Sequence, residues 1–122
     1  MPVLSTALDA VGAISKRPGF QQSASELEAV NQLLTLAETQ FSRCDAWALA
    51  AFIRCAAAFK GLLQPGTLAA WQRALRPCTQ QLTSHGVSSA MLALHTLAAS
   101  DPQLAAVVDA ELAQHLLQRA LL

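Results

Sequence analysis

The 122-residue chain has little charge: Asp, Glu, Lys and Arg together make up 13% of it, against about 25% in a typical soluble domain. Eight basic residues balance eight acidic ones, so the formal net charge is zero. Such a chain has no global attraction to nucleic acid or to an anionic membrane. A surface this poor in charge is typical of proteins that other protein subunits cover.

Tyrosine is absent and aromatic residues reach only 5%, whereas hydrophobic residues make up 53% of the chain. Strands favour β-branched and aromatic residues, and few stretches here are rich in them. Leucine and alanine dominate instead, and both are strong helix formers. The composition therefore predicts an all-α fold.

Cysteine is scarce and odd in number. Cys44, Cys55 and Cys78 form no CxxC pair, which argues against the disulfide framework of a small secreted domain. The N-terminus also lacks the apolar segment of a secretory signal. We expect a soluble protein in a reducing compartment.

Motifs for catalysis and for metal binding are missing as well. The carboxylates are scattered, and Ser84-His85 and His95 have no nearby acid to complete a triad. The histidines and cysteines lack the spacing of metal ligands, and no phosphate-binding glycine loop occurs. We expect no enzyme, no cofactor and no metal.

One apolar run, AWALAAFIRCAAAFKGLL over residues 46–63, is long enough to suggest a membrane span. Arg54 lies in its middle, and placing a guanidinium at the centre of a bilayer costs about 2.5 kcal/mol or more. Alanine contributes little apolar area in return. The run is therefore predicted to be a helix of a protein core and not a membrane span.

Proline, glycine and capping signals divide the chain into helices. Ser23-x-x-Glu26 is a capping box, and Asp101-Pro102 combines an N-cap with proline at the first helical position. Pro77 is predicted to end a helix, and Gly86 is a weaker break. We expect helices over 3–14, 23–41, 46–63, 67–76, 87–99 and 102–122. The last has no stop signal, so the natural chain is expected to continue or this end to dock on a partner.

A helix pair recurs along the chain, in a register that matches Phe41 with Leu82 and Ile53 with Leu94. Recurring helix pairs are typical of α-solenoids. The sequence thus predicts a right-handed, α-solenoid-like stack of antiparallel helix pairs with about six helices. It forms one domain over 1–122, in which 1–22 is a capping helix and 23–66 and 67–122 are repeat-like pairs.

The repeated segments resemble octotricopeptide repeat proteins, which are built from 38-residue helical pairs and occur in algal organelles. The family's better-kept stretch reads roughly D-L-A-N-T-L-W-A-L-A-K-L. GVSSAMLALHTL at 86–97 is similar to it at the Met-Leu-Ala-Leu centre, and DAWALAAFIRCA at 45–56 matches at Asp45 and Ile53. The resemblance covers 41–122. It implies RNA binding in a chloroplast or mitochondrion, in transcript maturation, translation or ribosome assembly, without catalysis.

A central basic zone supplies the candidate RNA-binding residues. Residues 42–78 carry a net charge of +4. Trp47 and Arg54 are seven residues apart, so they line up along one helix face about 10 Å from each other, and both can stack on bases. The alternative is that Trp47 packs between repeats while Arg54 reaches solvent. The full candidate set is Arg43, Trp47, Arg54, Lys60, Arg73 and Arg76. A merely solvated face is the alternative for Arg73 and Arg76.

Three functions are compatible with these features. The first is a non-catalytic protein that binds single-stranded or ribosomal RNA inside an organellar ribonucleoprotein, such as a mitochondrial or chloroplast ribosome, together with other protein subunits. The second is a structural helical scaffold subunit of a large protein assembly without RNA contact. The third is a stand-alone helical bundle that binds an apolar ligand.

Overall fold

The computed structural model describes residues 24–59 and 61–121 of the chain. The helix predicted over 3–14, the capping residue Ser23 and the candidate Lys60 lie outside the described residues. The described elements are α2 (Ala24–Thr39), η1 (Phe41–Arg43), α3 (Ala46–Ala58), α4 (Pro65–Leu75), η2 (Arg76–Gln81), α5 (Ser84–Ser100), α6 (Pro102–Val107) and α7 (Ala110–Ala120), where η marks a 3₁₀ helix.

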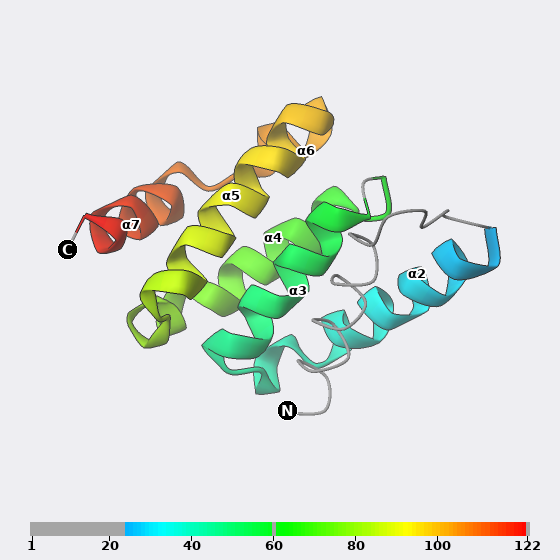
Figure 1. Ribbon diagram of the computed structural model, residues 1–122, viewed down its shortest axis with the longest axis horizontal. Coiled ribbons are helices and arrows are strands. Elements are labelled where there is room, and N and C mark those ends of the chain that lie inside the picture. The colour runs from blue at the N-terminus through cyan, green and yellow to red at the C-terminus, as the bar shows by residue number, and fades with distance from the viewer. Residues whose placement is uncertain (1–23, 60, 122) are drawn as a thin grey trace.

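The helices pack in two layers. In one layer α3 contacts α5 and α5 contacts α7, a row that Figure 1 shows. In the other layer α2 contacts α4 and α4 contacts α6. Short connections join α3 to α4 and α5 to α6, and such neighbours pack antiparallel. The prediction of an all-α stack of helix pairs is confirmed, with six α-helices and no strand among the described residues.

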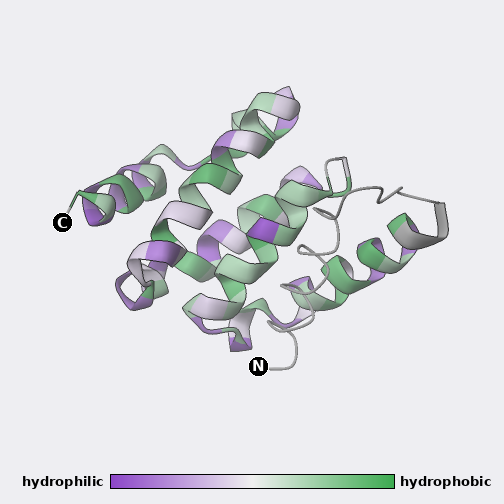
Figure 2. Cartoon of the chain, viewed as in Figure 1, coloured by the Kyte–Doolittle hydropathy of each residue, from purple (hydrophilic) through white to green (hydrophobic). Residues whose placement is uncertain are grey.

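Helix α3 lies at the centre of the core. Leu49 and Phe52, which lie on one side of α3, are buried, as are Phe59 and Leu63 just after the helix. Figure 2 shows hydrophobic residues along most of this helix. On the opposite face Ala50 and Ala51 are buried as well, and α3 contacts α5, whereas Trp47 on this face is exposed. Among the described residues, no helix combines the length and hydropathy that crossing a bilayer requires.

The helix caps show the repeat most clearly. Asp45 caps α3 by accepting the Ala48 N–H at 2.9 Å, and Thr83 caps α5 by accepting the Gly86 N–H at 3.0 Å. The N-cap positions of α4 and α6, Gln64 and Asp101, are separated by nearly the same interval as Asp45 and Thr83. The sequence register that matches Phe41 with Leu82 differs from this interval by almost one helical turn. For that reason both registers align buried positions of α3 with buried positions of α5, and only the capping residues show which register is correct.

Several predicted boundaries were wrong. Helix α3 ends at Ala58, because the chain turns at Gly61, whose φ of +92° favours glycine. Gly86 does not break the chain but lies buried in the first turn of α5, which begins at Ser84. A Cβ at Gly86 would come within 3.2 Å of the Leu82 side chain, so close packing explains this glycine. Pro77 acts as predicted, since α4 ends at Leu75 and a 3₁₀ helix follows.

The predicted helix over 102–122 is in fact two helices. Val108 leaves the helical range with a ψ of 126°, and the Asp109 carboxylate then accepts the N–H groups of Glu111 and Leu112. A capping aspartate starts a new helix because it satisfies backbone N–H groups that have no partner inside that helix. The sequence has no glycine or proline at this break, and for that reason the helical spacing of apolar residues predicts one continuous helix.

Candidate nucleic-acid interface

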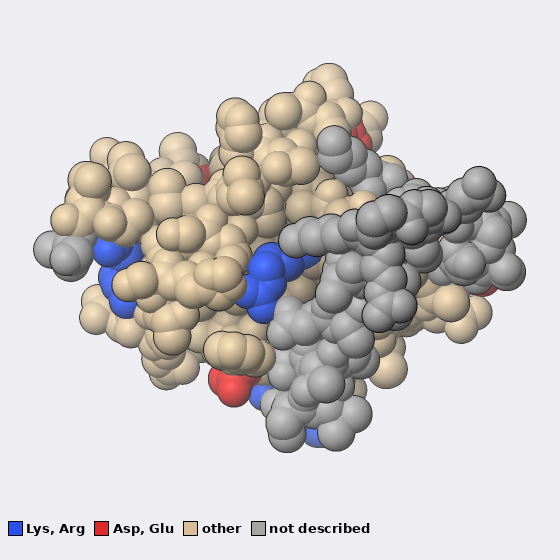
Figure 3. Space-filling view, viewed as in Figure 1, with Lys and Arg blue, Asp and Glu red and all other residues tan. Residues whose placement is uncertain are grey.

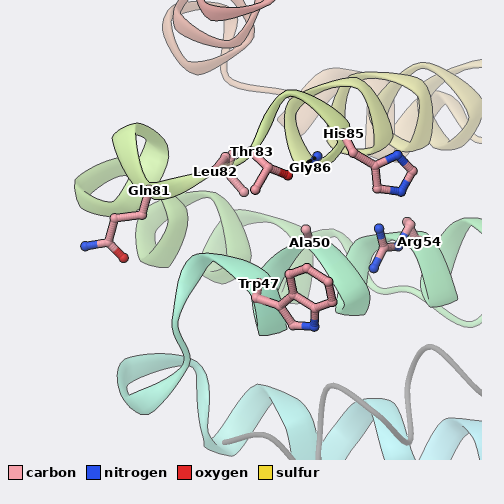
Figure 4. A pocket seen from close by; sticks show the side chains of 8 residues that line it. All are labelled: Trp47, Ala50, Arg54, Gln81, Leu82, Thr83, His85 and Gly86. Carbon is pink, nitrogen blue, oxygen red and sulfur yellow. Dashed lines mark hydrogen bonds between the residues drawn. The ribbon is translucent and has the colours of Figure 1, made fainter.

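A small groove lies between α3 and the start of α5, and we call it the α3–α5 groove. Its volume is about 30 Å³, small beside the ~300–1,000 Å³ of ordinary ligand pockets. Figure 4 shows its lining, with Trp47, Ala50 and Arg54 along α3 and the other residues between the end of η2 and the first turn of α5. The lining residues are Trp47, Ala50, Arg54, Gln81, Leu82, Thr83, His85 and Gly86.

Trp47 presents its indole ring at this groove. It lies two residues after the N-cap of α3, and 58% of its surface is exposed. It is therefore not packed between helices, which was the alternative considered for it. The second tryptophan, Trp71, is fully buried and donates its indole N–H to the Leu49 carbonyl at 2.8 Å. Of the two tryptophans, only Trp47 is thus placed to stack on a ligand.

Arg54 lies further along the same side of α3 and is half-buried. Its guanidinium donates to the Ser89 hydroxyl of α5 at 3.5 Å, so it links two neighbouring helices of the layer. Figure 4 shows the His85 ring facing Arg54 from α5. The predicted alignment of Trp47 and Arg54 therefore brings both to the α3–α5 groove.

Sequence reasoning did not assign His85 to this site. His85 occupies in α5 the place that Trp47 occupies in α3, because each lies two residues after the N-cap of its helix. In the register that matches Phe41 with Leu82, Trp47 aligns with Ser88 instead. The signal was the pair of capping residues, Asp45 and Thr83, which sets the register.

Arg73 and Arg76 lie away from the groove, at α4 and the start of η2. They line a depression of about 360 Å³ together with Gln72, Val107 and Asp109. The Arg76 guanidinium pairs with the Asp109 carboxylate at 2.5 Å and with the Glu111 carboxylate at 3.4 Å. The charge of Arg76 is thus compensated within the chain, which the local sequence did not indicate. Arg73 is exposed.

The candidate residues that the structure describes, which leave out Lys60, do not form one basic patch. Trp47 and Arg54 meet at the α3–α5 groove, Arg73 and Arg76 meet at the α4 depression, and Arg43 is exposed on η1. On the face that Figure 3 presents, the charged side chains of the described residues stand at separate points. Any contact with RNA would therefore depend on stacking more than on a dense field of positive charge.

The carboxyl group of Asp109 titrates below its ordinary value. Partial desolvation acts to raise its pKa, but the N–H of Leu112, the Arg76 guanidinium and the N–H of Glu111 together lower the pKa below 3.8. A carboxyl whose pKa is lower in the folded state stabilises the fold above its unfolded pKa. This stabilisation is lost as pH falls through the folded pKa.

Replacing Asp109 by asparagine is therefore expected to lower the urea midpoint of unfolding at neutral pH, with a difference from the wild type that shrinks below pH 3.8. Asparagine keeps the helix cap but loses the charge that pairs with Arg76. The control is Asp101→Asn, since Asp101 also caps a helix, through the Gln103 N–H. A difference that persists unchanged into acid would contradict the assignment to charge.

The cysteines and histidines add no further centre among the described residues. All three cysteines are free thiols. Burial raises the pKa of the Cys44 thiol, and the neighbouring Asp45 raises it further, which disfavours the reactive thiolate. No group of three or more His, Cys, Asp or Glu side chains in the described part of the chain could hold a metal ion.

Comparison of the chain with protein-family models, with curated proteins and with solved structures found no match. The resemblance to octotricopeptide repeats therefore stays a prediction from the sequence. The fold class follows from the helices and their packing, whereas the function is inferred from the site.

Proposed function

We propose that this chain is a non-catalytic helical-repeat protein that binds single-stranded RNA in an organellar ribonucleoprotein, such as a mitochondrial or chloroplast ribosome. The observation that carries the proposal is the exposed Trp47 ring at the α3–α5 groove, beside Arg54 and His85. Three planar groups from two neighbouring helices gather there. Planar side chains of this kind stack on unpaired bases.

The size of the groove favours an extended strand over an inserted base. At about 30 Å³ it is far smaller than an ordinary ligand pocket, so a base is expected to lie on the outer surface of the Trp47 ring. Such stacking requires bases that are free of a duplex, because paired bases bury their faces on each other. Single-stranded RNA is therefore the nucleic acid that suits this surface.

The repeat length supports the organellar setting. The interval from the α3 cap, Asp45, to the α5 cap, Thr83, is the repeat length of the octotricopeptide proteins that the sequence resembles. That family implies an RNA partner in a mitochondrion or chloroplast. The two stretches that suggested the resemblance begin 41 residues apart, at Asp45 and Gly86, so the caps agree with the family's repeat length but not with the register of the resemblance.

The affinity is expected to be modest and only weakly dependent on salt. The net charge is zero, and Arg76 is engaged by Asp109 and Glu111. Each phosphate that a protein neutralises on a single strand contributes about −0.7 to the slope of log K against log salt. With one or two phosphates neutralised we expect a slope of roughly −0.7 to −1.4.

Replacing Trp47 by alanine is expected to weaken the binding of a fluorescein-labelled single-stranded RNA about 5- to 150-fold, because stacking on one base contributes about 1–3 kcal/mol. The measurement is fluorescence anisotropy at about 50 mM salt, with a salt series on the wild type. Arg54→Ala is expected to weaken binding as well, and Arg76→Ala much less.

The matched control is Leu36→Ala, because Leu36 on α2 is similarly exposed, at 56%, but lies away from the groove. It should bind RNA as the wild type does. Failure of the wild type to bind at about 50 mM salt, or equal affinity of the Trp47 and Leu36 variants, would refute the proposal.

A second candidate is a scaffold subunit without RNA contact, and a specific observation favours it. Large apolar side chains are exposed on three helices, at Leu36, Leu92 and Leu117, while Arg76 is engaged within the chain. Exposed apolar side chains at several places are typical of surfaces that bind protein. In this case the anisotropy titration would show no RNA binding, and the wild type would associate with protein subunits only.

A further inference from the structure

Helix α7 carries a second apolar side that faces away from the fold. Its inner leucines, Leu112 and Leu116, are fully buried. Leu117, the residue after the buried Leu116, is 46% exposed, and Leu121 is 78% exposed. In Figure 1 α7 stands at the end of the row formed with α3 and α5. The helix thus has one leucine pair for the core and another for the outside.

The outward leucines belong to a continuous stripe. At 100° per residue, positions three, four and seven apart share one side of a helix. We call this set the outer stripe of α7. It comprises Ala110, Ala113, Leu117, Ala120 and Leu121, of which Ala113 is partly buried and the others are exposed. A stripe of this pattern is what one helix presents to another.

The Asp, Glu and Arg side chains of α7 and its cap are all engaged inside the chain. Asp109 and Glu111 pair with Arg76 of the α4–η2 segment. The Arg119 guanidinium donates to the carbonyl of Thr79 and, at 2.7 Å, to the carbonyl of Leu82. These contacts fix α7 against η2 and turn its charges away from the outer stripe. Gln114 and Gln118, both exposed and uncharged, border the stripe.

This distribution of charge selects the partner. A strongly charged surface would find no opposite charge on the outer stripe and would lose hydration on contact. A second copy of the outer stripe carries the same apolar side chains, so two stripes can bury these side chains against each other. Glutamine amides carry donors and acceptors together, so the border residues can bond to their equivalents. A face that complements itself forms a two-fold dimer.

We propose that two copies of this chain associate through α7, with the outer stripes packed against each other and Leu117 and Leu121 as the large apolar side chains of the contact. Helix α7 has 11 residues, or about 16 Å of length. The interface is therefore at the small end of specific contacts, below about 1,200 Å² in total. We expect a dissociation constant on the order of 100 µM.

Sedimentation velocity on the 122-residue chain tests this, over about 10 to 500 µM protein. The wild type should shift from monomer to dimer across this range. Leu121→Gln and the double variant Leu117→Gln/Leu121→Gln should remain monomeric, with unchanged helical circular dichroism. Leu121 follows the last residue of α7 and is 78% exposed, so its replacement should leave the fold intact.

The control is Leu36→Gln, the same substitution at an exposed leucine of α2, which should dimerise as the wild type does. A wild type that is monomeric up to about 500 µM overturns the proposal, as does a dimer that Leu121→Gln leaves intact. Loss of the dimer in Leu36→Gln but not in Leu121→Gln places the interface on α2 and overturns it equally. RNA plays no part in this test, so its outcome is separate from that of the proposed function.

Discussion

Replacing Trp71 by alanine is expected to lower the free energy of unfolding by about 3–5 kcal/mol, the range for truncating a buried aromatic side chain. Trp71 is fully buried in α4, and its indole N–H bonds to the backbone carbonyl of Leu49 in α3. The substitution leaves a cavity between the two helices and removes the hydrogen bond that links them. A loss of this size is a large part of the stability of a small domain, about 5–15 kcal/mol.

Urea unfolding followed by circular dichroism measures this loss, and two further variants interpret it. Trp71→Phe keeps most of the ring but loses the N–H donor, and it should be less destabilising than alanine. Trp47→Ala is the matched control, because Trp47 is 58% exposed, and it should change stability by less than about 1 kcal/mol. Equal losses at Trp71 and Trp47 would contradict the placement of the two side chains.

Replacing Gln72 by leucine is expected to lower the free energy of unfolding by about 2–3 kcal/mol, although leucine is apolar and the position is buried. The Gln72 amide donates to the Val107 carbonyl at 3.0 Å and accepts the Asp109 N–H at 2.7 Å. Leucine can do neither, so two backbone groups at the α6–α7 turn lose their partner. The turn itself, and with it the position of α7, should loosen.

Hydrogen exchange alongside urea unfolding tests this prediction at the affected place. Protection of α7 amides should fall more in Gln72→Leu than protection of α3 amides. Gln103→Leu is the control, since Gln103 is exposed on α6. This variant should leave the free energy of unfolding and the protection of the α7 amides almost unchanged. Gln72→Leu as stable as the wild type, with α7 equally protected, would show that the amide is dispensable.

Much of the helical architecture could be predicted because its signals are local. Asp101-Pro102 marks the start of α6 by cap chemistry alone, and Pro77 marks the end of α4. The inward stripe of α3 follows from helical periodicity. The break between α6 and α7 does not, because the contacts that favour it come from Gln72 and Arg76, which belong to a different helix pair far earlier in the chain.

The candidate site was predictable to the same extent and for the same reason. Trp47 and Arg54 share one helix, so their spacing alone placed them on one side. The engagement of Arg76 depends on acids 33 and 35 residues later, and no local pattern reveals it. His85 required the correct repeat register, which differs from the assumed one by almost a helical turn and was visible only in the caps at Asp45 and Thr83.

The proposed function is tested most directly by the fluorescence of the two tryptophans during titration with single-stranded RNA at about 50 mM salt. Trp47 is exposed and Trp71 is buried, so they emit at longer and shorter wavelengths, and Trp71 serves as an internal reference. If bases stack on Trp47, RNA quenches the long-wavelength emission, leaves the emission of Trp71 unchanged, and quenches nothing in Trp47→Ala. Unchanged emission from both tryptophans across the titration would contradict RNA binding at the α3–α5 groove.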